Sequence, residues 1–138
     1  MEELIRISEH DGSGIGGETF CGEFLVSVLN FLPRLVPEKV VSMQKHTETD
    51  ECFILLQGKA MIFLADGMDR PENISCRTLE PNKIYTVPKG VWHQPVMTKD
   101  AKILLVEKSN TVDANSPRLP LTDGQTAEVR RLGAEFAH

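Results

Sequence analysis

The chain has 138 residues, of which 41% are hydrophobic and 25% are charged. This length and composition are typical of a globular protein with one core, so we expect a single domain over residues 1–138. Lys and Arg number 15 against 20 Asp and Glu, which leaves a formal net charge of −5. A net negative charge disfavours general binding to nucleic acid or to anionic membranes. A small molecule or another protein is the expected partner.

Three cysteines, Cys21, Cys52 and Cys76, are widely spaced in the sequence. An odd number without a Cys-x-x-Cys pair argues against a disulfide framework and against a zinc ribbon. The N-terminal residues lack a basic region followed by a long apolar core, and no apolar run approaches the roughly 20 residues that span a bilayer. We therefore expect reduced cysteines and a cytoplasmic protein.

The N-terminal part of the chain alternates β-type segments with loops. Residues 4–7 are predicted as a short strand, and the glycine-rich residues 11–17 are predicted as a flexible surface loop. Residues 20–32 have enough apolar side chains for a helix, but their β-branched and aromatic residues and the proline that follows favour a strand. Residues 40–44 form the next predicted strand.

The middle of the chain contains a regular series of further β-type segments. Residues 52–56 and 60–64 are two apolar runs around Gly58, and a hairpin is predicted there because glycine tolerates a positive φ angle. Three more strands are predicted at residues 74–79, 84–87 and 103–106. Short strands at intervals of roughly 8–12 residues, separated by glycine and proline turns, indicate a sandwich or barrel.

The C-terminal segment differs from the rest, because it is polar and contains prolines before a helix-like pattern begins. Thr122 and Gln125 have the spacing of a capping box, which predicts the start of a short helix. Val129, Leu132 and Phe136 then share one face of that helix. We expect this face to pack on the exterior of the barrel or on a partner subunit.

Two histidines and a carboxylate stand beside predicted strands, far apart in the sequence. His46 and Glu51 precede the apolar run 52–56, and His93 follows a Pro-x-Gly turn. A carboxylate at the start of such a run needs compensation if it points inward, and a divalent cation provides it. Two imidazoles and a carboxylate suit zinc, iron, manganese or nickel. These residues therefore predict a metal site that a closed sheet assembles.

The spacing of these residues resembles the two sequence motifs of the cupin superfamily. The first motif is a histidine pair followed by a glutamate and a glycine, and its last three positions correspond to His46, Glu51 and Gly58. The second motif is a glycine, a Pro-x-Gly and a histidine, and it corresponds to residues 88–90 and His93. Two motifs in the right order and with the right internal spacing make this resemblance specific.

The resemblance covers about half of the chain, roughly residues 40–107. It implies an all-β fold, namely a cupin-type double-sheet β-barrel or jelly roll, with a barrel core at about residues 20–108. Residues 109–138 then form a C-terminal tail with the short helix. A homodimer is expected, since cupins commonly pair and the N-terminal strand and the tail offer exchangeable edges.

The chain departs from the cupin pattern at Gln44, Asn82 and Met97, which replace a histidine, a glycine and an asparagine. As the resemblance implies, the metal ligands are His46, Glu51 and His93, and Gln44 can add its carbonyl oxygen as a fourth. Gln44 equally fits a weakened site. The alternative is a metal-free cupin in which the two histidines and the glutamate hydrogen-bond one another in a polar pocket.

Four residues are predicted to line the site and to contact the substrate. Phe53 shares strand parity with Glu51, and Met61 adds apolar wall. Trp92 precedes the second histidine and is expected at the mouth of the pocket. Tyr85 is a candidate proton donor. Each of the four also fits an ordinary place in the core.

The sequence lacks a Gly-x-Ser-x-Gly elbow, a Gly-x-x-x-x-Gly-Lys phosphate loop and a basic, aromatic-rich stretch. The leading hypothesis is therefore a metal-dependent enzyme acting on a small polar metabolite, in which a divalent transition metal polarises a carbonyl or hydroxyl group or activates water. Within the superfamily this covers isomerases, lyases and dioxygenases. The alternatives are a non-catalytic small-molecule binding or sensor module, with or without metal, and a structural scaffold.

Overall fold

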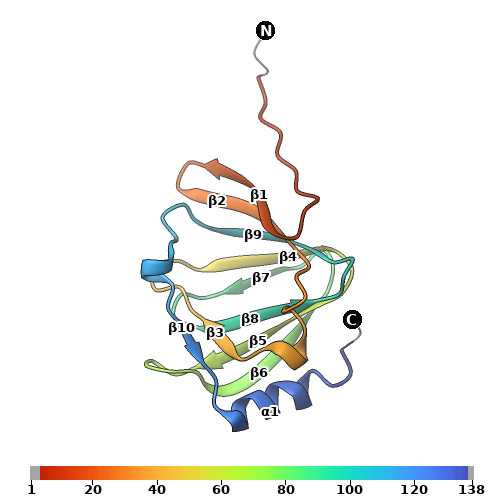
Figure 1. The fold of residues 1–138 in the computed structure, drawn as a ribbon. Coiled ribbons are helices and arrows are strands. Elements are labelled where there is room, and N and C mark those ends of the chain that lie inside the picture. The colour runs from red at the N-terminus through yellow and green to blue at the C-terminus, as the bar shows by residue number, and fades with distance from the viewer. Residues whose placement is uncertain (1–3, 137–138) are drawn as a thin grey trace.

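The computed structural model describes residues 4–136, and within this range ten strands form two five-stranded antiparallel sheets. Sheet A has the order β1 (Gly14–Cys21), β2 (Phe24–Asn30), β9 (Lys102–Lys108), β4 (Glu51–Gln57) and β7 (Ile84–Val87). Sheet B has the order β10 (Arg118–Pro120), β3 (Ser42–Gln44), β8 (Trp92–Met97), β5 (Ala60–Asp66) and β6 (Glu72–Leu79). The sheets face each other as a jelly-roll barrel (Figure 1). The prediction of an all-β, double-sheet fold is confirmed.

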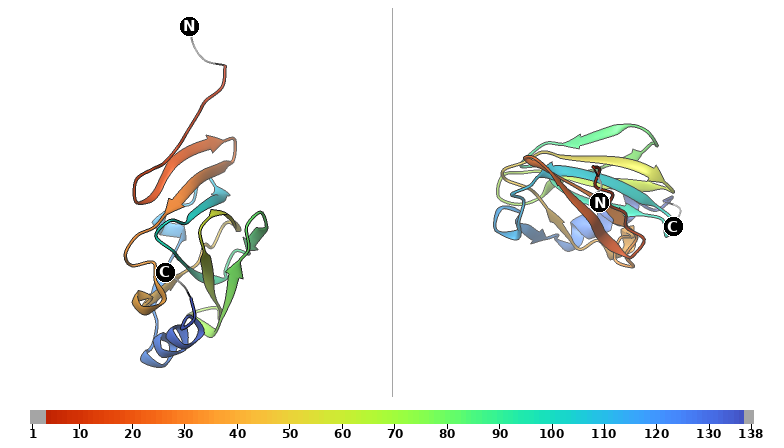
Figure 2. Two further views of the ribbon diagram at one scale, coloured as in Figure 1. Left: turned by 90° about the vertical axis from the view of Figure 1, so that its right-hand side faces the viewer. Right: turned by 90° about the horizontal axis from the view of Figure 1, so that it is seen from above.

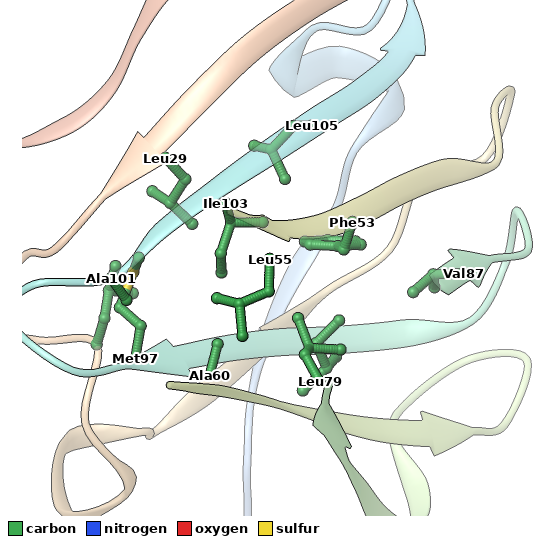
Figure 3. Packing of buried hydrophobic residues seen from close by; sticks show 12 residues of the cluster. Leu29, Phe53, Leu55, Ala60, Leu79, Val87, Met97, Ala101, Ile103 and Leu105 are labelled. Carbon is green, nitrogen blue, oxygen red and sulfur yellow. The ribbon is translucent and has the colours of Figure 1, made fainter. Parts of the chain in front are cut away.

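The main core lies between the two sheets and follows the strand period of two. On β4, Phe53 and Leu55 are buried while the residues between them are half-buried, and on β9 Ile103 and Leu105 are buried in the same way. Figure 3 shows these side chains meeting those of the opposite sheet. The buried members of this cluster are Leu29, Leu35, Phe53, Leu55, Ala60, Ile62, Leu79, Val87, Met97, Ala101, Ile103 and Leu105.

A second core covers the outer face of sheet B. Helix α1 (Asp123–Leu132) and the 3₁₀ turn η1 (Pro37–Lys39) pack there, with α1 beside β6 (Figure 1). The buried members of this second cluster are Val40, Met43, Met61, Phe63, Ala65, Trp92, Val96 and Val129. A further 3₁₀ turn, η2 (Asp113–Asn115), lies before β10. Strands β5 and β8 of sheet B are therefore buried on both faces.

The predicted helix start is confirmed in detail. The Thr122 hydroxyl accepts a hydrogen bond from the Gln125 backbone N–H (3.2 Å), and the Gln125 side-chain oxygen accepts one from the Thr122 N–H (3.0 Å). This reciprocal pair satisfies two N–H groups that a helix start leaves open. Val129, Leu132 and Phe136 contact the second cluster as predicted, and Phe136 does so from beyond the helix end.

The N-terminal predictions need correction. Residues 4–7 form no strand, and β1 begins at Gly14, inside the segment that was predicted as a loop. Glycine contributes no side chain to the packing of a strand, but pairing with β2 supplies the backbone hydrogen bonds of β1. Gly17, which has a positive φ angle, lies at a bulge in that pairing. Residues 20–32 hold a turn at Gly22 that separates β1 from β2. β1 and β10 extend the sheets beyond residues 20–108.

The strands around Gly58 do not form the predicted hairpin. β4 belongs to sheet A and β5 to sheet B, so the turn at Gly58 carries the chain from one sheet to the other. Gly58 does have a positive φ of 75° as expected. Strand β8 was not predicted from the sequence, and it runs through Pro95, a residue without the N–H that a strand donates. β3 pairs with β8 only at His93, so the missing N–H of Pro95 costs no bond to β3.

Figure 2 shows the β1–β2 hairpin extending beyond the rest of the barrel, with the first described residues running away from it. Among residues 4–136 no helix is long and apolar enough to cross a membrane.

Replacing Gly58 with alanine should destabilise the protein by roughly 3 kcal/mol, since the new Cβ adds a backbone clash to the cost of a positive φ angle. That Cβ would lie 2.5 Å from the Cα of Ala101. Gly90→Ala is the matched control, because Gly90 has a φ of 85° and nothing within 4 Å of the added Cβ. Urea denaturation measures both variants. Equal losses of stability would contradict the role given to the contact with Ala101.

Candidate metal centre

The two cupin-like motifs meet inside the barrel. Glu51 is the first residue of β4, and the parity that buries Phe53 directs Glu51 inward as well. His93 lies on β8 of the opposite sheet, and His46 lies in the loop between β3 and β4. The two loops are tied together, because the backbone N–H of Gly90 donates to the carbonyl of His46 (2.8 Å). The Pro-x-Gly turn thereby helps to place the histidine of the other motif.

The three side chains form one compact, buried group. The Nε2 atoms of His46 and His93 lie 3.0 and 3.1 Å from the same oxygen, Oε1 of Glu51. The residues are 7%, 4% and 6% exposed, respectively. Their possible ligand atoms all lie within 4.8 Å of one another, so the group can hold a metal ion.

Hydrogen bonds on the far side of each ring favour metal binding through Nε2. Nδ1 of His93 lies 3.0 Å from the backbone oxygen of Val91, which can only accept, so this nitrogen carries a proton. Nε2 is then the ring nitrogen that faces Glu51 and the position that a metal ion would take. Nδ1 of His46 lies 2.7 Å from the hydroxyl of Ser116, and this hydroxyl accepts there because it donates its own proton to the side-chain oxygen of Asn115 (3.2 Å). The donors present, two imidazole nitrogens and one carboxylate oxygen, fit a divalent transition metal.

The charge of Glu51 is stabilised where it stands. Burial raises the pKa of this carboxyl, but hydrogen bonds from His46 and His93, together with their positive charges, lower it to about 2. Glu51 is therefore ionised at neutral pH, as a metal ligand must be.

Glu107 is a fourth site residue that the sequence reasoning missed. Its Oε2 lies 3.6 Å from Nε2 of His46, and in residues 4–136 this oxygen is buried without a hydrogen-bond partner. Burial, and then the negative charge of Glu51, raise the pKa of Glu107 to about 7. An unpartnered buried oxygen beside the ligand group is further support for a cation there. Strand parity after Ile103 and Leu105 could have predicted its inward position.

Two of the three departures from the cupin pattern have a structural explanation. Asn82, at the glycine position, has a φ of 67°, which asparagine adopts more readily than most residues. Gln44 pairs with His93 across β3 and β8, and its side-chain N–H donates to the backbone oxygen of Ser116 (3.1 Å). The amide nitrogen is thus engaged, and the carbonyl oxygen is the end that remains for a metal. Met97 is fully buried in the main core.

A cavity of about 300 Å³ opens beside the group. Phe53 lines it as predicted, and its ring stands edge-on to His93, with ring centroids 5.8 Å apart. The other apolar lining residues are Ile15, Leu29, Leu32, Leu35, Pro95 and Leu105, and the polar ones are Arg34, Gln44, Glu51, His93, Gln94 and Arg118.

Met61, Trp92 and Tyr85, which were predicted to line the site, do not line this cavity. Met61 and Trp92 lie in the second cluster under α1, because successive residues of a strand point to opposite faces and Trp92 precedes the inward His93. The indole N–H of Trp92 donates to the carbonyl of Gly67 (2.9 Å). Tyr85 packs against the main core, and its hydroxyl accepts from the backbone N–H of Glu80 (3.0 Å).

Two arginines at the cavity were also missed. Arg118 donates from Nη1 to the hydroxyl of Ser42 (3.0 Å) and to the side-chain oxygen of Gln94 (2.8 Å). Burial, and then the positive charge of Arg34, lower the pKa of Arg118. Arg34 stands in a loop before η1 and Arg118 in a three-residue strand near the tail, so no periodicity marked them.

Comparison with known proteins gives the following matches. No family model matches the chain. Over 83 residues it is 32% identical to a ureidoglycolate lyase of Burkholderia cepacia, which covers 58% of this chain and 47% of that protein. The chain thus spans about half the length of the curated relative it matches.

Two solved structures share the fold over most of the chain. Streptomyces PAC13 with uridine gives a TM-score of 0.61 at 10% identity, covering 92% of this chain and 98% of that one, and Pac13 is described as a nucleoside dehydratase. The 3,4-ketoisomerase QdtA from Thermoanaerobacterium thermosaccharolyticum, in complex with TDP-4-keto-6-deoxyglucose, gives 0.53 at 14% identity, covering 82% and 75%. The chain therefore has a cupin-type jelly-roll fold that brings the residues of both cupin-like motifs together at one interior site.

Glu107 should make the metal-free protein less stable as pH rises. Its carboxyl keeps its proton up to a pKa of about 7 in the folded state but only to about 4.5 when unfolded. The unfolded state therefore binds fewer protons between these values, and stability falls across that window. Glu107→Gln should remove this fall. At pH values above the window the variant should be more stable than the parent protein by roughly 1–3 kcal/mol.

Urea denaturation of chelator-treated protein, at several pH values from about 4 to 8, measures the effect. Glu23→Gln in the β1–β2 turn is the control for removing one carboxylate. A stability difference between Glu107→Gln and the parent that does not change with pH would contradict the assignment.

Proposed function

We propose that this protein is a metal-dependent enzyme acting on a small polar metabolite, with His46, Glu51 and His93 as the protein ligands. The observation that carries this proposal is the convergence of both Nε2 atoms on one Glu51 oxygen at the wall of a cavity. Three protein ligands leave coordination positions open, as catalytic metal sites do. A bound divalent ion, zinc, iron, manganese or nickel, would polarise a carbonyl or hydroxyl group of the substrate.

The residues around the ligand group suit proton transfer. Glu107, with its pKa near 7, is placed to hold or release a proton at Oε2 beside His46. Phe53 and the apolar wall limit water on the other side of the cavity. Among the isomerase, lyase and dioxygenase classes, the similarity to a ureidoglycolate lyase makes lyase activity the first to test.

A second candidate is a non-catalytic binding or sensor module. It is favoured by the same hydrogen bonds, because His46, Glu51 and His93 satisfy one another without a cation. Gln44 in the place of a histidine points in the same direction.

Metal analysis separates the two candidates. Protein purified without added metal should contain close to one transition-metal ion per chain, and His46→Ala and His93→Ala should lose it, since each removes one of three ligands. His10→Ala is the control, because the His10 ring bonds to the backbone oxygen of Gly14 in the N-terminal segment and is not part of the ligand group. Elemental analysis and metal titration provide the measurement.

The same variants should lose any cleavage of ureidoglycolate that the parent protein shows, followed as loss of the substrate. A folded parent protein without metal would contradict the enzyme proposal and support the binding module. A metal that survives both histidine substitutions would contradict the ligand assignment.

We further propose a cytoplasmic homodimer formed through the β1–β2 hairpin. Ile15 and Phe20 are 58% and 53% exposed. They pair with Leu29 and Leu25, so they stand on the face of sheet A that turns toward the barrel interior. Because the hairpin extends past the barrel (Figure 2), a second copy can cover them. Free Cys21, Cys52 and Cys76 suit a reducing compartment.

Phe20→Lys should shift the protein toward monomer in sedimentation velocity, since it places a charge in the proposed interface. Phe24→Lys is the matched control, because Phe24 is equally exposed (53%) and points to the opposite face of the hairpin. A parent protein that sediments as a monomer would contradict the proposal.

A further inference from the structure

Arg34 and Arg118 line the same cavity as Glu51 and His93. Arg118 begins β10 and stands beside Gln44 on β3, which in turn stands beside His93 on β8. Neighbouring strands are about 4.8 Å apart, so the backbones at Arg118 and His93 are roughly 10 Å apart on one face of the sheet. The cavity of about 300 Å³ that both residues line has room for a ligand of a few carbon atoms.

Neither guanidinium takes part in an ion pair of the described chain, in contrast to Arg131, which pairs with Glu128. The protein acceptors of Arg118 are neutral oxygens, and both bonds leave from Nη1. Two like charges at one cavity repel each other, and Arg118 also loses part of its hydration there, although both side chains remain exposed. The chain as a whole has more acidic than basic residues, so this local excess of positive charge runs against its composition.

The two bonds from Nη1 also fix the orientation of the Arg118 guanidinium at the cavity. A guanidinium held in this way presents a planar set of donors that matches the oxygens of a carboxylate or phosphate. The remaining wall is largely apolar, through Leu29, Leu35 and Phe53. The cavity therefore combines two arginines and apolar side chains with Glu51 and His93 of the ligand group.

We propose that Arg34 and Arg118 form an anion subsite that binds the carboxylate or phosphate group of a small substrate and directs its polar carbon toward the His46, Glu51 and His93 group. The direction toward this group rests on the proposed function. The anion subsite itself needs only the two arginines. Both arginines act in substrate binding and orientation.

Binding of three small probes to the full chain tests the subsite, at low ionic strength and by calorimetry or NMR titration, with and without added zinc. Glycolate carries a carboxylate and inorganic phosphate carries a phosphate, while ethylene glycol is a neutral analogue of glycolate. Glycolate or phosphate should bind, and ethylene glycol should not. The tighter of the two anions identifies which group the subsite takes.

Arg34→Gln and Arg118→Gln should each weaken anion binding at least about tenfold, since each removes charge-assisted hydrogen bonds. Arg118→Lys should lose less, because it keeps the charge. Arg130→Gln is the control for net charge, because Arg130 is exposed on α1 far from the cavity. If Arg118→Gln fails to fold, Arg34→Gln decides the question.

Anion affinity that is equal in the parent, Arg34→Gln and Arg118→Gln would overturn the subsite, and so would a parent protein that binds neither anion. Metal content measured on the same samples tests the proposed function separately, so failure of the anion subsite and failure of the metal site can be told apart. If the parent protein is metal-free and Arg118→Gln still weakens its binding of glycolate or phosphate, the enzyme proposal is contradicted but the anion subsite is supported.

Discussion

A carboxylate that is 6% exposed inside a barrel requires compensation, and Glu51 obtains it from two imidazoles on different elements. His93 reaches it from the opposite sheet, and His46 reaches it from a loop. The loop is held by the backbone bond from Gly90 to His46, and the side chain of Asp50 accepts from the N–H of Lys89. Closure of the barrel at this end and assembly of the site therefore depend on the same contacts.

Strand parity explains which site residues the sequence could predict. Counting in steps of two from Glu51 gives Phe53 at the cavity, and the same count from Leu105 would have given Glu107. Met61 and Trp92 were assigned to the cavity without such a count. Counting from His93 would have placed Trp92 on the other face, whereas β5, which holds Met61, is buried on both faces. A run that is apolar at every position does not indicate which face turns inward. Only the packing of α1 on the outer face settles that choice.

The prediction of strands succeeded more often than the prediction of their partners. Gly58 has the expected positive φ, yet β4 and β5 enter different sheets. A glycine turn between two apolar runs is locally compatible with either arrangement. The close approach of Ala101 to Gly58 comes from a segment far along the chain, so no local pattern could show it. Hairpin geometry is local, whereas sheet membership depends on long-range packing.

Gln44 is the departure from the cupin pattern that bears most on the site. Its side-chain N–H donates to the backbone of Ser116, and the hydroxyl of Ser116 bonds to His46. Gln44 is therefore joined through the tail segment to the ring whose Nε2 faces Glu51. The same segment continues into β10 and carries Arg118 to the cavity. A histidine at position 44 would offer a further metal ligand, whereas the glutamine holds the tail segment that orients His46 and carries Arg118 to the cavity.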